Sequence, residues 1–216
     1  MDRDIIADKV VAQGQIPAYT IIPPGIGGFK FKQPDYETWT QALRIKKAKQ
    51  LLNEAGFNKN NPLKFNLVYN SSDMHKKIAI AATSMWKKTL GVIANIQTEE
   101  WKVLLDNEHQ GKFDVVRGGW IGDYNNPMSF LNIFTTNQSN NTSFYSNKDF
   151  DHWVKKSRET NKKEDFQQAI DILTENTPIA PVYYYVTAQL VKPYIGGYDS
   201  NLIGLTSTKD LYVIKH

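Results

Sequence analysis

Hydrophobic and polar positions along the 216-residue chain follow two different periods. Apolar residues that recur every three or four positions predict amphipathic helices. They do so at residues 2–13, 40–55, 71–91, 148–158 and 163–174. Asp2 is the expected N-cap of the first helix and Gly14 its stop, while Gly56 and Gly91 should end the next two.

Two of these helices have clear apolar stripes that should face a core. In the helix predicted at 40–55, the stripe consists of Leu43, Ala48, Leu51, Leu52 and Ala55. In the helix predicted at 71–91, it consists of Ile78, Ala82, Met85 and Leu90. Ser71, Ser72 or Asp73 can cap the second of these helices.

Alternating apolar residues predict strands at 63–70, 92–98 and 113–119. Thr98 is the expected cap of a short helix that runs through Asn107, with Glu99 and Glu100 in its first turn. The order strand, helix, strand, helix, strand predicts an α/β layer with a mainly parallel sheet. Ligands of such sheets collect at the carboxyl ends of the strands.

The remaining segments are less periodic. Residues 15–38 contain five turn signals and read as an ordered strap, because five large side chains give it something to bury. These are Tyr19, Ile21, Ile22, Phe29 and Phe31. A short helix is expected at 128–134, a polar loop at 135–143, a strand and turns within 180–200, and a last strand at 211–216.

Composition and charge exclude several kinds of chemistry. The absence of cysteine excludes disulfides, thiol catalysis and cysteine metal sites. The four histidines are not paired at ligand spacing, and no G-x-S-x-G elbow or phosphate loop is present, so neither a metal nor a cofactor is expected. The net charge of +4 is spread over lysine runs that read as solvated helix faces, so no nucleic-acid groove is expected. No run is apolar enough to cross a bilayer, and the first residues lack the pattern of a secretory signal.

The stretch RGGWIGDYNNP, residues 117–127, follows the third predicted strand and so lies where ligands collect. Asp123 stands in a glycine-flanked turn near Arg117 and Trp120. Its carboxylate can face a cleft and pair with a cationic group. The alternative is a turn aspartate that bonds its own backbone, and this stretch alone favours that alternative.

Five stretches, in order, resemble one family over nearly the whole chain. They are MDRDIIADKVVAQGQIPAY, AKQLLNEAGF, LVYNSSDMHKKIAIAATSMWKK, EEWKVLLDNEHQGKFDVVRGGWIGDYNNPMSFLN and APVYYYVTAQLVKPYIGGY. This set is similar to the carboxyl-terminal part of the periplasmic oligopeptide-binding proteins, the family 5 extracellular solute-binding proteins of peptide ABC transporters.

The resemblance implies an α/β fold, a lobe of the type II periplasmic binding proteins with a mainly parallel mixed sheet flanked by helices. Residues 1–176 would form the second, peptide-binding lobe, and residues 177–216 the hinge and a tail that returns to the first lobe. The implied partners are oligopeptides, the N-terminal lobe of the same protein and a membrane permease. The implied location is the periplasm, or the cell surface as a lipoprotein, with the signal peptide in a preceding part.

The resemblance also implies roles for single residues. Asp123 would pair with the α-ammonium of a bound peptide, and Trp120 and Trp101 would wall side-chain pockets. Arg117 matches an arginine near the cleft. His75 matches a histidine that can approach the far end of a peptide, and Tyr185 matches a cleft tyrosine near the hinge. For each of the last five, a purely structural role is the alternative, such as core packing, a bridge within the lobe or a place on the helix surface.

Three positions depart from the family's best-known member. Val11 and Glu108 stand where that member has cationic residues, and Ile121 stands where it has cysteine. We expect an altered length or side-chain preference, with basic peptides favoured. Other readings are a carrier of dipeptides, murein peptides, haem or glutathione, or a peptidase that lacks visible catalytic groups. The two-lobe protein should be a monomer, whereas the lone lobe should bind peptide weakly and self-associate through unpaired strands.

Overall fold

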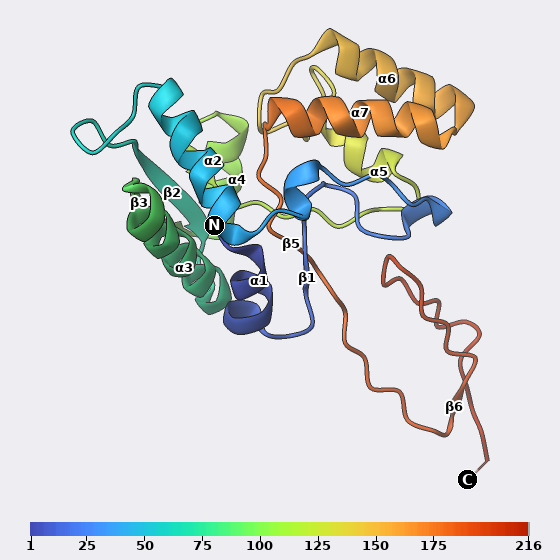
Figure 1. Ribbon diagram of the computed structural model, residues 1–216. Helices are drawn as coiled ribbons and strands as arrows, with labels where there is room; N and C mark the ends of the chain where they lie inside the picture. Colours follow the sequence, from blue (N-terminus) through green and yellow to red (C-terminus); the bar gives the residue numbers. More distant parts are fainter. Residues whose placement is uncertain (216) are drawn as a thin grey trace.

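A computed structural model describes residues 1–215 (Figure 1). One end of the molecule is an α/β layer, and the other is a helical unit built around the adjacent helices α6 (Lys148–Thr160) and α7 (Lys163–Asn176). A long irregular tail leaves the body after residue 185 and ends far from it. None of the helices within residues 1–215 has the length and apolar character that a membrane crossing requires.

The α/β layer contains a three-stranded sheet of order β3-β2-β4, made of β2 (Lys64–Asn70), β3 (Ile93–Glu99) and β4 (Val115–Val116). All pairings are parallel, and Leu67 of β2 lies opposite both Ile96 and Val115. The predicted parallel sheet is confirmed. The third strand is shorter than expected from 113–119, because pairing continues only to the Arg117 amide, which donates to Val68 O at 2.8 Å.

Helix α3 (Asp73–Leu90) follows β2 and begins at the Ser72 cap, one of the three predicted caps. Ile78 and Ala82 of its predicted stripe are buried, and Gly91 ends the helix in the left-handed conformation that glycine tolerates. Helix α4 (Trp101–His109) follows β3. The prediction that Thr98 caps it was wrong, since β3 extends through Glu99 and the cap is Glu100, whose carboxylate accepts from the Lys102 amide at 2.9 Å.

Helix α2 (Gln41–Glu54) confirms the helix predicted at 40–55 and begins at the Thr40 cap, but it buries none of its residues. The predicted apolar stripe was wrong in this respect: Leu43 and Leu51 are 43% and 52% exposed. Helix α2 packs against α3, on the outside of the layer, so only part of its surface meets another element.

The amino-terminal helix is confirmed, with two differences. It consists of α1 (Arg3–Ile5) and a wider π-helical continuation, η1 (Ile6–Val11), and Asp2 caps it by accepting from the Ile5 amide at 3.2 Å. It ends at Ala12 in a left-handed conformation, two residues before the predicted stop at Gly14. Val11 is buried there against Ile78 of α3.

The larger core lies in the helical unit. It is formed by α5 (Met128–Leu131), the 3-10 turn η4 (Asn132–Phe134), α6 (Lys148–Thr160) and α7 (Lys163–Asn176). Its fully buried members include Leu131, Phe150, Val154, Phe166 and Ile170. These helices confirm the predicted helical segments, and the predicted polar loop at 135–143 is a series of turns between η4 and α6.

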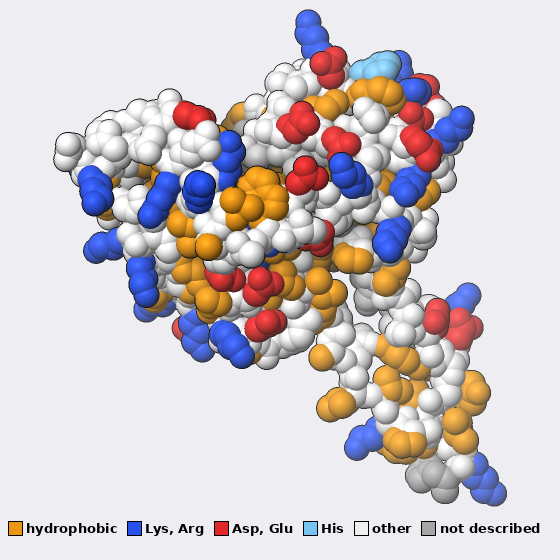
Figure 2. Space-filling model, in the orientation of Figure 1, with side chains coloured by type: hydrophobic (Ala, Val, Ile, Leu, Met, Phe, Trp, Pro, Cys, Tyr) orange, Lys and Arg blue, Asp and Glu red, His pale blue; other side chains and the backbone are white. Residues whose placement is uncertain are grey.

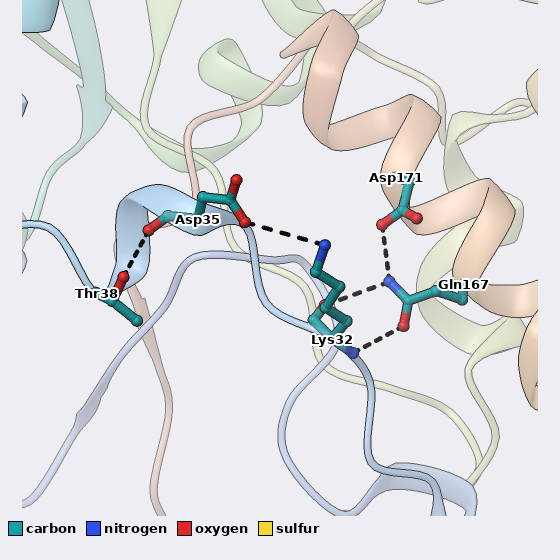
Figure 3. A network of polar contacts seen from close by, with 5 residues as sticks. All are labelled: Lys32, Asp35, Thr38, Gln167 and Asp171. Carbon is teal, nitrogen blue, oxygen red and sulfur yellow. Dashed lines mark hydrogen bonds and ion pairs between the residues drawn. The ribbon is translucent and has the colours of Figure 1, made fainter.

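The predicted strap, which contains the 3-10 turns η2 (Ile26–Gly28) and η3 (Asp35–Glu37), crosses this core. Figure 3 shows how the side-chain amide of Gln167 in α7 forms hydrogen bonds with the backbone of the strap. The Lys32 amide donates to Gln167 Oε1 at 2.8 Å, and Gln167 Nε2 donates both to Lys32 O at 3.3 Å and to Asp171 Oδ1 at 2.8 Å. The strap is therefore an ordered part of the fold and no linker.

Two short antiparallel pairs complete the chain. β1 (Ile16–Pro17) pairs with β5 (Tyr183–Tyr184), which joins the start of the strap to the segment after α7. β6 (Ile195–Gly196) pairs with β7 (Tyr212–Val213) inside the tail. The predicted strands within 180–200 and 211–216 are thus present in part, and His216 lies outside the described residues.

Candidate ligand-binding site

The candidate residues lie mainly just beyond the carboxyl ends of the three sheet strands. His75 is in the first turn of α3, after β2, and Trp101 is the first residue of α4, after β3. Arg117 begins the loop after β4. Because parallel strands end at one edge of a sheet, a helix start or a loop follows each of them there. This edge is the one that the sequence predicted.

At the end of β2, His75 is held by its neighbours in sequence. The Ser72 hydroxyl accepts from the His75 amide at 3.5 Å, and His75 Nδ1 lies 2.7 Å from Asn70 Oδ1. Burial, followed by the positive charge of Arg117, lowers the pKa of His75, and its contact with Asn70 opposes this only in part. The imidazole is therefore uncharged at neutral pH.

At the end of β4, Arg117 joins two segments that are far apart in the sequence. Its guanidinium donates a hydrogen bond to the hydroxyl of Tyr185 and lies 5.9 Å from the centre of the Tyr185 ring. The ring of Tyr183, in β5, packs edge-on against Tyr185 at 5.3 Å. The segment after β5 therefore returns to the carboxyl edge of the sheet and fixes the arginine.

Arg117 also influences the acids and bases around it. Burial raises the pKa of the Glu108 carboxyl, and the charges of His109 and Arg117 oppose this rise. Burial likewise raises the pKa of the Tyr183 phenol, which is close enough to feel Arg117. Glu108, His75 and Tyr183 thus lie within electrostatic reach of one guanidinium. The structure brings four predicted residues together here: His75, Glu108, Arg117 and Tyr185.

The loop after Arg117 is fixed by α5. Trp120 Nε1 donates to Ser129 O at 2.7 Å, and the hydroxyl of Ser129 accepts from the Asp123 amide at 2.7 Å. Gly122 passes so close to Phe130 that a β-carbon there would lie 2.7 Å from the ring. Two bonds to a fully buried helix and one close approach therefore hold the loop in a single place.

The carboxylate of Asp123 is the free group on this fixed loop. It is exposed, and within residues 1–215 it accepts no hydrogen bond and forms no ion pair. A turn aspartate that bonds its own backbone would show such a bond. Ile121 beside it is 75% exposed and Tyr124 is also exposed, whereas the ring of Trp120 is half-buried against the larger core.

Other predicted members of the site stand apart. Trp101 is 52% exposed and has no described contact with the Arg117 group or with Asp123. Trp86 packs edge-on against Phe65 within the α/β layer and takes no part in the site. Within residues 1–215, no group of three or more His, Asp or Glu is arranged to hold a metal ion.

Two hollows of the surface lie away from the candidate residues. One is a cavity of about 20 Å³ between the strap and the end of α7, lined by Tyr19, Tyr36 and Ile179 among others. The other is an open depression of about 270 Å³ on the sheet, lined by Asn66, Gln97 and Asp114 among others. Neither includes a predicted site residue. The candidate residues at the carboxyl edge of the sheet form one wall.

Sequence reasoning missed three residues that shape this wall: Asn70, Ser129 and Tyr183. Asn70 could have been found, since it is the last residue of a strand that was predicted to end at the ligand edge. The roles of Ser129 and Tyr183 depend on segments that meet only in the folded chain, and nothing in the local sequence indicates them.

Comparison with known proteins gives one consistent result. The profile of the bacterial extracellular solute-binding proteins, family 5 (middle part), matches residues 1–142. The periplasmic oligopeptide-binding protein OppA of Salmonella typhimurium is 48% identical over all of this chain and 41% of its own length. The chain thus spans about two fifths of this relative.

Solved structures agree. The murein tripeptide-binding protein MppA of Escherichia coli superposes with a TM-score of 0.90 and 38% identity, over the whole chain and 43% of MppA. OppA of Haemophilus influenzae, in complex with the peptide RPPGFSPFR, superposes with a TM-score of 0.87 and 39% identity, over the whole chain and 44% of that protein. The lobe-type α/β fold with its parallel sheet is confirmed by these neighbours.

Proposed function

The chain belongs to family 5 of the bacterial extracellular solute-binding proteins, and from that membership we propose that it forms the second lobe of an oligopeptide carrier. The carrier would hold an extended peptide between two lobes and deliver it to the permease of an ABC importer. The names of its relatives support the ligand class, and the family is one of binding proteins. We place the carrier in the periplasm, as its OppA relatives are, or at the cell surface as a lipoprotein.

The observation that carries this proposal is the unpartnered carboxylate of Asp123 on a loop that α5 holds rigidly. A fixed acid without a partner suits the α-ammonium of a peptide, because the pair then forms without rearranging the protein. When the opposite lobe covers this edge and excludes water, losing one member of the pair costs about 3–5 kcal/mol.

The rest of the edge supports an extended peptide that is held mainly through its backbone. Strand-like hydrogen bonds give affinity without sequence preference, and water in roomy pockets adapts to many side chains. We propose Trp120 and Trp101 as pocket walls; both present ring surface at the carboxyl edge. We assign Arg117, fixed by Tyr185, to the far part of the peptide together with the uncharged His75.

Glu108 and Ile121 are proposed to set the side-chain preference. Glu108 is half-buried near Arg117, and Ile121 projects into solvent beside Asp123. Val11, at a position where the family's best-known member has a cation, is buried and offers no group to a ligand. We therefore expect Lys-rich tripeptides to bind more tightly than Glu-rich ones at low salt, measured by calorimetry. Equal affinities would contradict this preference.

The assignment of Asp123 is tested in the two-lobe protein by replacing it with asparagine. We expect Asp123→Asn to weaken the binding of a tripeptide with a free α-ammonium group by two to three orders of magnitude, which corresponds to about 3–5 kcal/mol. Asp106→Asn, at an exposed site of α4, is the matched control and should change nothing. An N-acetylated tripeptide lacks the α-ammonium and should bind both variants equally. A full loss for the acetylated peptide as well would refute the pairing.

The tail supports the proposal that residues 177–216 belong to the hinge and to contacts with the first lobe. Leu190, Leu202, Leu205, Tyr212 and Val213 expose large apolar side chains along it. Such surface is usually covered. The isolated chain should therefore self-associate and bind peptide weakly, while the two-lobe protein should be a monomer. Light scattering that shows a strict monomer of the isolated chain with micromolar peptide affinity would contradict this.

A second candidate is a carrier of the same fold for another ligand, because MppA, a murein tripeptide-binding protein, superposes on this chain about as well as OppA of Haemophilus influenzae does. Native mass spectrometry of the two-lobe protein from cells distinguishes the two, since it weighs whatever ligand co-purifies. A peptidase is the least supported reading, and a turnover assay on peptides would detect one.

A further inference from the structure

The positive charge of the chain is concentrated in one part of it. Residues 41–91, from α2 through α3, contain ten Lys and Arg but only two Asp and Glu, a net charge of +8. The rest of the chain contains sixteen Lys and Arg against twenty Asp and Glu, a net charge of −4. The mild total of +4 therefore conceals a strongly polarised molecule.

Most lysines of this segment are exposed. Eight are exposed, six of them on the two helices: Lys46, Lys49, Lys76, Lys77, Lys87 and Lys88. None of them forms an ion pair with an acid within residues 1–215. Figure 2 shows Lys and Arg side chains spread over the part of this face that α2 and α3 form, whereas both signs of charge are mixed over α6 and α7.

Exposed aliphatic side chains lie among these lysines. Leu43 and Leu51, eight residues apart, lie on the same side of α2, where they flank Lys46 and Lys47. Ile80 of α3 is 45% exposed, with Lys76 and Lys77 one turn before it. The α2–α3 basic face, as we call the exposed residues of these two helices, is therefore both cationic and partly apolar.

We propose that the α2–α3 basic face binds an anionic lipid surface. Lysines near such a surface gain from its negative potential, and exposed leucine and isoleucine can enter the boundary between headgroups and acyl chains. Long lysine side chains adjust to a fluid surface by extending their charged ends from an apolar stem. The contact requires neither peptide binding nor the carboxyl edge of the sheet.

The residue types favour lipid over an acidic protein. All of the exposed cations on this face are lysines, whereas the one arginine, Arg44, is bonded to the backbone carbonyls of Tyr36 and Glu37. Protein interfaces are enriched in arginine and depleted of lysine, because the planar arginine fork matches a fixed carboxylate. A dispersed set of flexible ammonium groups suits mobile phosphate headgroups better.

The test is co-sedimentation of the chain with unilamellar vesicles at 50 mM salt. Vesicles of phosphatidylcholine with 30 mol% phosphatidylglycerol should bind it, and pure phosphatidylcholine vesicles should not. Binding should disappear at 0.5 M salt, where charges are screened within a few ångströms. Inorganic phosphate at constant ionic strength should not compete, which separates a lipid surface from a site for a free anion. Equal binding to both vesicle types, or competition by phosphate, would overturn the proposal.

Two matched variants locate the surface. Lys46→Gln, Lys49→Gln, Lys87→Gln and Lys88→Gln remove four exposed cations from the basic face. The control replaces four exposed lysines of α6, α7 and the N-cap of α7 with glutamine: Lys148, Lys155, Lys162 and Lys163. Both variants have a formal net charge of 0, so net charge alone cannot separate them. Circular dichroism verifies that each is folded.

Each lysine near an anionic surface contributes about fivefold to partitioning, so the first variant should bind at least a hundredfold more weakly. The control should stay within about threefold of the original chain. Leu43→Ser with Leu51→Ser should lower binding further at fixed charge. An equal loss in both lysine variants would overturn the proposal, as would binding to soluble polyglutamate without binding to vesicles, which would instead indicate an acidic protein partner.

Discussion

The helix pairs α2–α3 and α6–α7 have similar lengths, but the first buries few residues, all of them in α3, and the second supplies much of the larger core. Helix α2 buries none of its residues, while α6 and α7 together bury Phe150, Val154, Phe166, Ile170 and Leu173 among others. Residues 41–91 have a net charge of +8, whereas residues 148–176 contain six Lys and Arg against seven Asp and Glu.

This difference indicates where stability and surface function reside. A helix that buries little contributes little to the free energy of unfolding, and its exposed sequence is then free to carry charge. A helix pair that supplies the core is constrained by packing, and its charges are balanced by neighbours. The α6–α7 pair should therefore govern the unfolding of this unit, and α2 should open locally.

The largest expected contrast comes from truncating one side chain in each pair. Phe166→Ala removes a fully buried ring from α7 and should lower the free energy of unfolding by about 3–5 kcal/mol. Leu51→Ala in α2 should change it by less than about 0.5 kcal/mol. Urea denaturation followed by circular dichroism measures both. Similar losses would mean that α2 is packed more firmly than its exposure indicates.

The next contrast concerns the loop that α5 holds. Gly122→Ala would place a β-carbon 2.7 Å from Phe130, and we expect a loss of about 1–3 kcal/mol from overpacking. Gly118→Ala, in the same loop, meets nothing within 4 Å and is the control. If both variants unfold at the same urea concentration, the loop is less firmly fixed than its bonds to Ser129 indicate.

Removing a helix cap should cost about 1 kcal/mol of helix stability in either pair. The two losses should appear in different measurements. Asn147 caps α6 by accepting from the Asp149 and Phe150 amides, so Asn147→Ala should lower global stability. Thr40 caps the exposed helix α2, so Thr40→Ala should mainly speed amide exchange within residues 41–54. Hydrogen exchange read by mass spectrometry separates local from global opening. Equal global losses would remove the distinction between the two pairs.

The smallest expected effect on stability appears only at acidic pH and concerns Asp165 of α7. A hydrogen bond from Thr160, together with Lys156 at 3.1 Å, lowers the pKa of the buried Asp165 carboxyl below its ordinary 3.8. Its stabilising contribution is present above pH 3.8 and is lost as the pH falls through the lowered value. Asp165→Asn should therefore flatten the loss of stability below pH 4, seen as the thermal midpoint against pH. If the thermal midpoint of the variant falls below pH 4 as steeply as that of the original chain, this prediction is wrong.

Local sequence was enough for most elements of the fold. The strand and the helix within residues 63–91 were predicted almost to the residue, because period, cap and glycine stop agree there. The prediction failed for the packing of α2, since an apolar stripe shows what a helix can bury and says nothing of what covers it. It also failed for the Thr98 cap, because pairing with β2 carried β3 on through Glu99.

The candidate site was predictable in its position and less so in its construction. Strand order placed Asp123 and Arg117 at a ligand edge, and the family resemblance suggested their roles. The partners that fix them, Ser129 and Tyr185, are six and 68 residues away. Tyr185 was expected at the site, but its bond to Arg117 arises only when the segment after β5 returns to the sheet. The roles of the eight site residues stay predictions.

The sequence by itself determined the elements, the parallel layer, the family and the excess of lysine between residues 41 and 91, because these depend on period, spacing and composition. Tertiary structure decided which apolar stripes are covered, which acid is left without a partner and which lysines stand free among exposed aliphatic side chains. These properties arise where segments that are distant in the sequence pack together, because close packing and the removal of water decide which groups are covered and which need a partner. The free carboxylate of Asp123 and the basic face of α2–α3 became visible only there.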